Sequence, residues 1–246
     1  MTNLHETNSS DFHFAEGEVL LVDKPLNWTS FDVVGKLRNS MKPLKVKVGH
    51  AGTLDPLATG LLILCTGKFT KKIDSYQAEN KEYTGTITIG ASTPSYDLET
   101  NIDQTYDYSA ITEEDLNQAK KQFLGNIAQF PPAHSAIKIN GERIYEKARR
   151  GEQVELKARQ VTITMFDIER VELPLIHFRI QCSKGTYIRS IAHDFGKALG
   201  IGAHLSSLRR TKSGNFNVQD AWNLDDLVNA IKAQKETNQK LANPTS

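Results

Sequence analysis

A glycine-rich loop followed directly by a wholly apolar segment most constrains how this chain can fold. The loop, residues 49–60, reads GHAGTLDPLATG, and its three glycines and one proline favour turns over regular structure. Residues 60–66 are predicted to form a strand, in which Leu61–Cys65 leave no polar side chain to face water. Such a strand needs cover on both faces, so we expect it in the interior of a layered fold.

Hydrophobic patterning predicts strands and helices that do not alternate strictly. Strands are expected at 19–22, 60–66, 82–89, 161–171, 175–182 and 205–210, and helices at 30–40, 69–76, 111–123, 143–150, 188–199 and 224–235. Thr29 or Ser30 is expected to cap the first helix and Thr112 the third, and Asn140-Gly141 predicts a tight turn. The mixture favours the α+β class. Phe31, Val34 and Leu37 are expected on the buried face of the first helix.

The length of 246 residues corresponds to one large domain or two small ones. No apolar run is long enough to span a membrane, and the first eighteen residues lack the apolar stretch of a secretory signal. Cys65 and Cys182 lie far apart and form no CxxC pair. We therefore expect a cytoplasmic protein with no membrane partner and no disulfide scaffold.

The formal net charge of +1 hides an uneven distribution. Residues 1–18 and 97–115 contain eleven acids and no Lys or Arg, so the other 209 residues carry a net charge of +12. Basic side chains gather in three segments: Lys36–Lys47, Lys138–Arg150 and Lys184–Lys212. Separate basic segments are typical of a polyanion-binding surface, although solvated surface charge gives the same pattern. We expect Lys36–Lys47 near a bound nucleic acid and the two acidic segments away from it.

Several kinds of chemistry are excluded by spacing. Gly67-Lys68 resembles a phosphate-binding loop, but Phe69 stands where such a loop requires Ser or Thr. No GxGxxG follows a predicted strand, and the seven histidines are scattered. Neither a nucleotide cofactor nor a metal is expected.

The glycine-rich loop carries a single carboxylate, Asp55. Pro56 biases the backbone of Asp55 toward an extended conformation, which fixes the direction of the carboxylate. A catalytic acid and a turn-capping aspartate are both compatible with this arrangement.

Residues Val48–Gly60 resemble the catalytic motif of pseudouridine synthases of the bacterial tRNA type (the TruB type), which modify the T-loop uridine at position 55 of tRNA. Further segments resemble the same family, in its order and spacing, from about Gly17 to about Leu227. They are Val19–Pro25, Lys81–Tyr83, Pro131–Lys138, Gly141–Ala148, Cys182–Arg189, Gly202–Leu205 and Leu208–Arg210. The resemblance implies the pseudouridine synthase fold, with a mixed, mostly antiparallel central sheet and flanking helices.

The resemblance also implies catalytic roles. Asp55 would be the catalytic carboxylate, and Arg189 would pair with it and hold it ionised. Tyr83 would stack on the target base and assist proton transfer at its C5. Two routes remain open for Asp55: attack on C1′, or removal of the 2′ proton to give a glycal. Because the reaction is an isomerisation, the resemblance implies no cofactor and no metal.

The implied substrate is a uridine flipped out of the T-arm of tRNA, at a cost of a few kcal/mol. The substrate-binding residues would be His50 near the flipped nucleotides, Tyr83 on the base, and Tyr187 and Leu208 along the uracil pocket. Stacking on an aromatic ring returns roughly 1–3 kcal/mol per base.

We expect a flexible acidic arm at residues 1–16, one catalytic domain at 17–238 and a disordered tail at 239–246. Many family members continue into an RNA-binding PUA domain, for which we expect no room, so RNA affinity would depend on the basic segments. Residues 91–100 depart from the family's Thr-Asp-Thr-x-Asp pattern, and His134 replaces an aromatic or large apolar residue. Neither is given a role.

The sequence therefore predicts a monomeric tRNA pseudouridine synthase, an intramolecular isomerase whose partner is the T-arm and for which no protein partner is implied. One alternative is a synthase of the same family that acts on another RNA. Another is a tRNA-binding or tRNA-folding module without essential catalysis.

Overall fold

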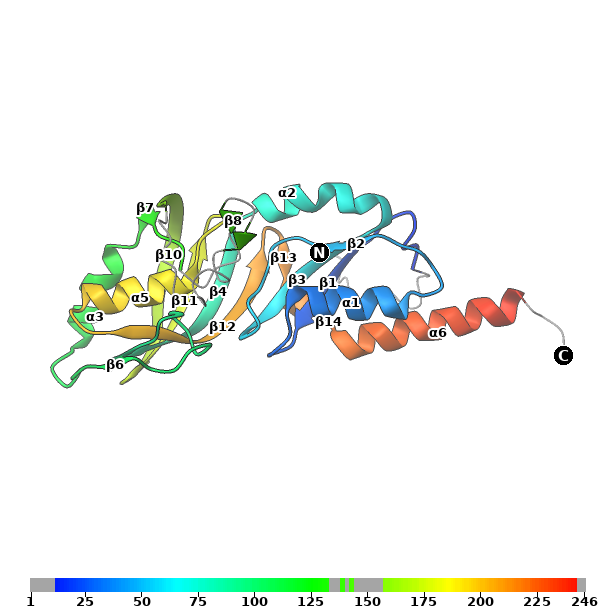
Figure 1. The fold of residues 1–246 in the computed structure, drawn as a ribbon. Helices are drawn as coiled ribbons and strands as arrows, with labels where there is room; N and C mark the ends of the chain where they lie inside the picture. The colour runs from blue at the N-terminus through cyan, green and yellow to red at the C-terminus, as the bar shows by residue number, and fades with distance from the viewer. Residues whose placement is uncertain (1–11, 133–137, 140–141, 144–156, 243–246) are drawn as a thin grey trace. The chain divides into compact units, whose positions relative to one another are not determined.

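The computed structural model describes residues 12–132, 138–139, 142–143 and 157–242 (Figure 1). These residues form two compact units. The first contains the chain up to Glu79 and again from Arg209 onward, and the second is Asn80–Leu208. The chain leaves the second unit within one strand, β12 (Ala203–Ser213).

The first unit is built around two long paired strands. Its strands besides the end of β12 are β1 (Val19–Lys24), β2 (Val48–His50), β3 (Ala58–Thr66), β13 (Phe216–Asn217) and β14 (Trp222–Asn223). β1 runs antiparallel to β3, from Val19 opposite Cys65 to Lys24 opposite Gly60. β2 is also antiparallel to β3, whereas β14 is parallel to β1.

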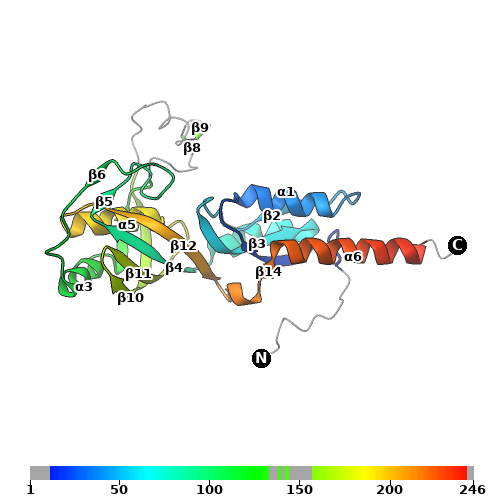
Figure 2. The same cartoon turned by 90° about the horizontal axis from the view of Figure 1, so that it is seen from below.

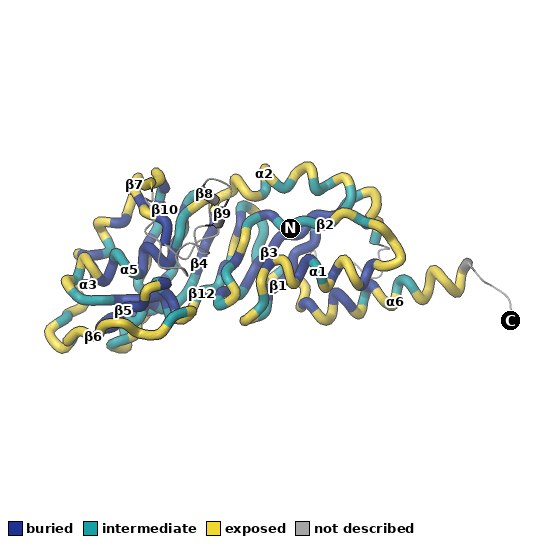
Figure 3. Tube along the Cα trace, viewed as in Figure 1, coloured by how far each residue is buried: buried dark blue, intermediate teal, exposed yellow. Residues whose placement is uncertain are grey.

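Helices cover both faces of β3. Helices α1 (Ser30–Ser40) and α6 (Leu224–Ala242) lie side by side on one face, where they enclose Leu62 and Leu64 (Figure 2). On the other face, Leu61 and Ile63 pack with Ile73 of α2 (Ile73–Ala78), which follows a 3₁₀ turn at Gly67–Lys72. β3 is buried along almost its whole length (Figure 3), which confirms the prediction from its apolar sequence.

The second unit is an antiparallel sheet with helices. β4 (Lys81–Ile89) lies between the start of β12 and β11 (Leu175–Cys182), and β10 (Arg159–Glu172) and β7 (Gly125–Gln129) follow. All pairings from β4 to β7 are antiparallel. Two short pairs complete the described strands: β5 (Ala91–Ser92) with β6 (Gln104–Thr105), and β8 (Lys138–Ile139) with β9 (Glu142–Arg143).

Aromatic rings form the core of the second unit. Phe123 follows α3 (Glu113–Lys121), and Phe195 lies on α5 (Ile188–Ala198). These rings and those of Phe166 and Phe178 have centroids 5.7–6.3 Å apart, within the range of favourable aromatic contact. Because most of the described pairings are antiparallel and β1 pairs with β14 in parallel, the fold is α+β with mixed pairing, as predicted.

The expected helix caps are present, but one expected core residue is not buried. Thr29 and Thr112 each cap a helix in a capping box. The expectation that Phe31 is buried is wrong, because its side chain is 68% exposed. Ser30 is buried and hydrogen-bonded to Leu54, and this contact orients the helix so that positions three, four and seven residues after Ser30 face inward.

Other differences concern short elements. Strand β2 occupies the start of the predicted loop, so the loop proper is residues 51–57. Strand β7 has the sequence GNIAQ, whose weak apolar alternation gives no strand signal. The predicted turn at 140–141 and most of the predicted helix at 143–150 lie outside the described residues. Helix α6 runs through Ala242, into the segment expected to be a tail. In the part of the chain that the structure describes, no helix is long and apolar enough to cross a membrane.

Candidate active site

The six residues predicted to form the site are divided between the two units. His50 and Asp55 lie in the first unit, and Tyr83, Tyr187, Arg189 and Leu208 lie in the second. The ion pair between Arg189 and Asp55 would join the two units and stays a prediction.

The loop that carries Asp55 is fixed at every second residue. Arg210 is buried and donates from Nη2 to the carbonyl of Gly52 (3.2 Å) and from Nε to that of Leu61 (2.7 Å). The Ser30 hydroxyl accepts from the Leu54 amide (2.9 Å), and the Asn27 amide donates to the Pro56 carbonyl (2.9 Å). The backbone on both sides of Asp55 is therefore held by groups outside the loop, which suits a preorganised carboxylate.

Lys24, at the end of β1, also hydrogen-bonds to the loop that carries Asp55. Its side chain is fully buried, and Nζ donates to the carbonyls of Trp28 (2.6 Å), Pro25 (2.9 Å) and Pro56 (3.4 Å). Burial lowers the pKa of Lys24 from 10.5 to about 8, and the charge of Asp55 acts against this shift. A buried cation thus lies in the electrostatic range of the predicted catalytic carboxylate.

His50 ends β2 just before the loop. Burial, and then the positive charge of Arg210, lower the pKa of His50, so its ring is neutral near pH 7. The exposed ring of Phe31 meets it edge to face, with centroids 5.1 Å apart. A neutral imidazole beside an exposed aromatic ring gives this part of the first unit flat surfaces on which bases can stack.

Arg189, in the first turn of α5, is held by a buried carboxylate. Its Nε lies 3.6 Å from Oδ2 of Asp97, and its Nη1 donates to the carbonyl of Ser95 (3.3 Å). Both side chains are less than a tenth exposed. Because a buried charge is costly unless it is paired, Asp97 stabilises Arg189 in one position.

The segment around Asp97 is itself fixed. The hydroxyls of Thr93 and Ser95 donate to the Asp97 carbonyl (2.6 and 3.1 Å). Tyr96 has a positive φ of 66° and stacks on His193 of α5, with centroids 3.7 Å apart. These contacts tie residues 91–100, to which the sequence gives no role, to the helix that carries Arg189.

Three further predicted residues lie in the second unit. Tyr83 is buried on β4, opposite Ile180 of β11. Leu208 is half-buried on the neighbouring strand β12, where the carbonyl of Ser207, the residue before it, closely approaches Gly85. The backbone of Tyr187 exchanges two hydrogen bonds with the side chain of Gln129 (2.8 and 3.0 Å), which fixes the start of α5.

Sequence reasoning missed Asp97 and Lys24. Asp97 belongs to an acidic segment expected to lie away from the RNA, yet it is buried against Arg189. Its signal, an acid within a run of Ser and Thr, is common in surface loops. Lys24 is followed by proline, but only the fold shows that its amine reaches Pro56.

Comparison with known proteins identifies the family. Residues 38–188 match the TruB family pseudouridylate synthase (N terminal domain), and residues 189–243 match the tRNA pseudouridylate synthase B C-terminal domain. The chain belongs to the TruB family. It is 58% identical to tRNA pseudouridine synthase B of Flavobacterium johnsoniae over 213 residues, which cover 85% of this chain and 93% of that protein. For the protein of the same name from Chloroherpeton thalassium the identity is 51%, over 91% of this chain and 94% of that protein.

Solved structures agree with this TruB-family assignment. A Cbf5–Nop10–Gar1 complex superposes with a TM-score of 0.71 at 31% identity. An H/ACA RNP bound to a substrate RNA containing 2′-deoxyuridine superposes with a TM-score of 0.68 at 28% identity. Each alignment covers 92% of this chain but only 56–57% of the other, so the chain spans little more than half the length of these structural relatives.

The TruB-family chain has no group of three or more His, Cys, Asp or Glu side chains, among its described residues, that could hold a metal ion. Cys65 and Cys182 are buried, and burial raises the pKa of each thiol to about 11. Neither is suited to act as a thiolate near pH 7.

Proposed function

We propose that this chain isomerises uridine to pseudouridine in tRNA, at the T-loop uridine, with Asp55 as the catalytic carboxylate. The observation that carries the proposal is the fixed loop around Asp55, in a chain that belongs to the TruB family along most of its length. The identity of 48–58% to proteins named tRNA pseudouridine synthase B favours tRNA over other RNAs. We also propose that the enzyme acts in the cytoplasm as a monomer.

The proposed reaction breaks the bond between C1′ and N1 of uridine and forms a bond between C1′ and C5. The C5 proton is lost to solvent and N1 gains one, so no atom is gained or lost overall. Asp55 would act at the sugar, either at C1′ or on the 2′ proton. The base must turn without leaving, and we assign that containment to the ring of Tyr83 together with Tyr187 and Leu208.

Arg189 would contribute a fixed positive charge to this chemistry. We propose that it pairs with Asp55, as the family motif implies, while Asp97 holds its other side. An arginine between two carboxylates is confined, and confinement of a charge before the reaction is what electrostatic preorganisation requires.

The test measures tritium release from tRNA transcripts that contain uridine labelled at C5. Asp55→Asn keeps the size of the side chain but removes the charge. We expect kcat to fall at least roughly 10³-fold, which corresponds to about 4 kcal/mol of transition-state stabilisation. Full activity of Asp55→Asn would contradict the proposed mechanism.

A matched control is Asp226→Asn, which changes the same chemistry at an exposed position on α6. It should release tritium at the wild-type rate. Carbodiimide-dependent stops of reverse transcription on the reacted tRNA should map the product to the T-loop, and a stop elsewhere would contradict the T-arm assignment.

The alternatives have distinct outcomes in the same assays. A synthase for another RNA would modify a ribosomal RNA fragment faster than tRNA. A binding or folding module would anneal tRNA equally well as wild type and as Asp55→Asn, with no tritium release from either.

A further inference from the structure

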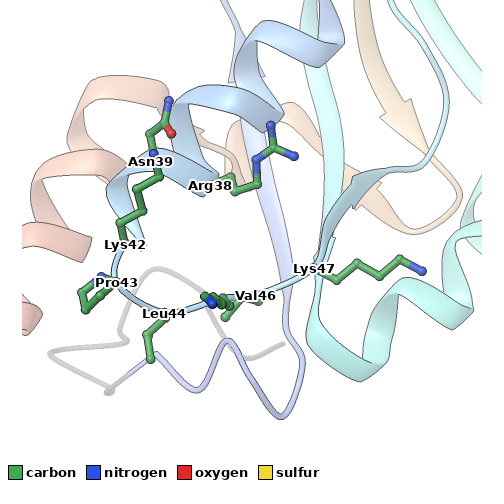
Figure 4. A pocket seen from close by; sticks show the side chains of 8 residues that line it. Arg38, Asn39, Lys42, Pro43, Leu44, Val46 and Lys47 are labelled. Carbon is green, nitrogen blue, oxygen red and sulfur yellow. The ribbon is translucent and has the colours of Figure 1, made fainter.

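A basic pocket lies in the first unit, between the last turn of α1 and the start of β2. It encloses about 880 Å³ and includes the side chains of Arg38, Lys42, Lys45 and Lys47 (Figure 4). None of the residues that line it is acidic. We call these four cations and the space between them the basic pocket.

The four cations of the basic pocket are exposed and not neutralised by the described residues. No ion pair or side-chain hydrogen bond joins any of them to another residue in the described part of the chain. Lys36, one turn earlier in α1, contrasts with them because it pairs with Asp225 at 3.5 Å. Uncompensated positive charges that line one cavity attract a polyanion.

The backbone of the basic pocket is fixed. Met41 is almost fully buried, and Val46 packs against the core between β3 and helices α1 and α6. Lys235 of α6 donates to the carbonyl of Ser40 at 3.2 Å and to that of Lys42. The four cations are therefore presented from a supported segment, which reduces the entropy lost when they hold a ligand.

The basic pocket is separated from the loop that carries Asp55 by one short strand, β2. Lys47 precedes β2, and β2 ends at His50, five residues before Asp55. A strand of three residues spans about 10 Å. The pocket and the loop that carries Asp55 therefore stand at opposite ends of one short strand within the first unit.

We propose that the basic pocket binds backbone phosphates of the RNA substrate beside the uridine on which Asp55 acts. This inference rests on the proposed function, and it assigns phosphate binding to one named surface. Lys and Arg that neutralise phosphates release counterions, which makes the affinity depend on salt. The exposed Leu44 at the rim gives the sugar an apolar contact.

The test is the salt dependence of binding to a T-arm stem-loop and to whole tRNA. Removing two cations in Lys42→Gln/Lys45→Gln should lower the slope of log K against log salt by about 1.8 and raise Kd about 30-fold at 0.15 M salt. KM should rise more than kcat falls. Wild-type Kd and slope in this variant would overturn the proposal.

The control is Lys232→Gln/Lys240→Gln, which removes the same charge from exposed positions on α6. Its Kd should change less than twofold. An equal loss in both double variants would mean that net charge alone matters, and it would also overturn the proposal. If the wild type binds tRNA but forms no pseudouridine, the proposed function is wrong. The Kd values of the two double variants would still test whether the basic pocket binds RNA.

A crosslink locates the RNA directly. Cys65 and Cys182 are buried with a raised pKa, so a thiol-reactive photo-crosslinker should label only Lys45→Cys. Illumination with the T-arm stem-loop should give a protein–RNA adduct, and Lys240→Cys labelled in the same way should not. Failure of the Lys45→Cys adduct, or its replacement in a cell extract by an adduct to an acidic protein only, would overturn the assignment to RNA.

Discussion

The guanidinium of Arg189 lies 3.6 Å from the carboxylate of Asp97, and both groups are buried. The pair joins the first turn of α5 to a segment that hydroxyls of Thr93 and Ser95 hold in place. Asp97 thus orients the arginine that we propose to pair with Asp55.

Asp97→Asn should lower kcat about 10–100-fold with little change in KM for tRNA, because the misplacement of a catalytic group by about 1 Å costs up to roughly 100-fold. The free energy of unfolding should fall by up to about 3 kcal/mol, since one charge of a buried pair is left alone. Steady-state kinetics and urea titration measure the two effects. Glu113→Gln, on the exposed start of α3, should alter neither. A rise in KM at constant kcat would contradict a positioning role.

Lys24→Met should weaken both folding and catalysis. The change keeps the length of the side chain but leaves the carbonyls of Pro25 and Trp28 without the amine, at a cost of about 1–3 kcal/mol for each unsatisfied buried group, whereas the Pro56 carbonyl loses the amine but keeps the Asn27 amide. Because one of the carbonyls belongs to Pro56, kcat should fall as well as the melting temperature. Lys36→Met, an exposed lysine on α1, should shift the melting temperature by less than a quarter as much. Equal shifts of the melting temperature in Lys24→Met and Lys36→Met would show that the hydrogen bonds of the buried Lys24 amine do not stabilise the fold.

His193→Gln should reduce the sensitivity of folding to acid. Burial, and then the charge of Lys197, lower the pKa of His193 from 6.5 to about 4, with Asp103 acting in the opposite direction. Between pH 6.5 and 4 the unfolded chain binds a proton that the folded chain does not, so wild-type stability falls as the pH falls. The decrease in the free energy of unfolding caused by His193 approaches about 3 kcal/mol below pH 4.

Urea midpoints at pH 7.0 and 4.5 check this prediction. The difference between the two midpoints should be smaller in His193→Gln than in the wild type, because the remaining carboxylates titrate in both. His13→Gln, an exposed histidine, should leave the difference as it is. The prediction fails if the two variants behave alike.

Gly60→Ala and Gly35→Ala should have opposite effects on stability. Gly60 has a φ of 99°, and a Cβ there would lie 2.3 Å from the carbonyl oxygen of Arg210, so the alanine variant should lose roughly 1–3 kcal/mol. Gly35 lies inside α1 with nothing within 4 Å of an added Cβ, so its alanine variant should gain about 0.5–1 kcal/mol. Thermal melts of both proteins give the two signs, and a Gly60→Ala protein as stable as wild type would refute the close approach.

Much of the fold could be predicted because it follows from local signals. The apolar run of β3 and the Thr caps of α1 and α3 each act over a few residues, and the structure confirms them. β7 could not be predicted, because its five residues form a strand only by pairing with residues of β10 that lie 30 to 38 positions later in the chain. Phe31 was misplaced because the rotation of α1 depends on a contact of Ser30 with Leu54, which no periodicity contains.

The site follows the same division. Asp55, Tyr83 and Arg189 could be named because they lie in motifs of fixed spacing. Asp97 and Lys24 could not, because what distinguishes them is burial beside a partner distant in sequence, Arg189 in one case and Pro56 in the other. The catalytic roles of the named residues await the experiments above.

The apolar sequence of β3 has a consequence for the accuracy of folding. When only one face of a strand is apolar, a slip of one residue is penalised because it turns the apolar set toward water. β3 is apolar on both faces, so its hydrophobicity alone does not penalise such a slip. The position of Gly60 does penalise it, because any other residue placed against the Arg210 carbonyl would clash. A slip would also move Asp55, five residues earlier, by about 3.3 Å. Gly60 therefore fixes the register of β3, and with it the position of the Asp55 carboxylate.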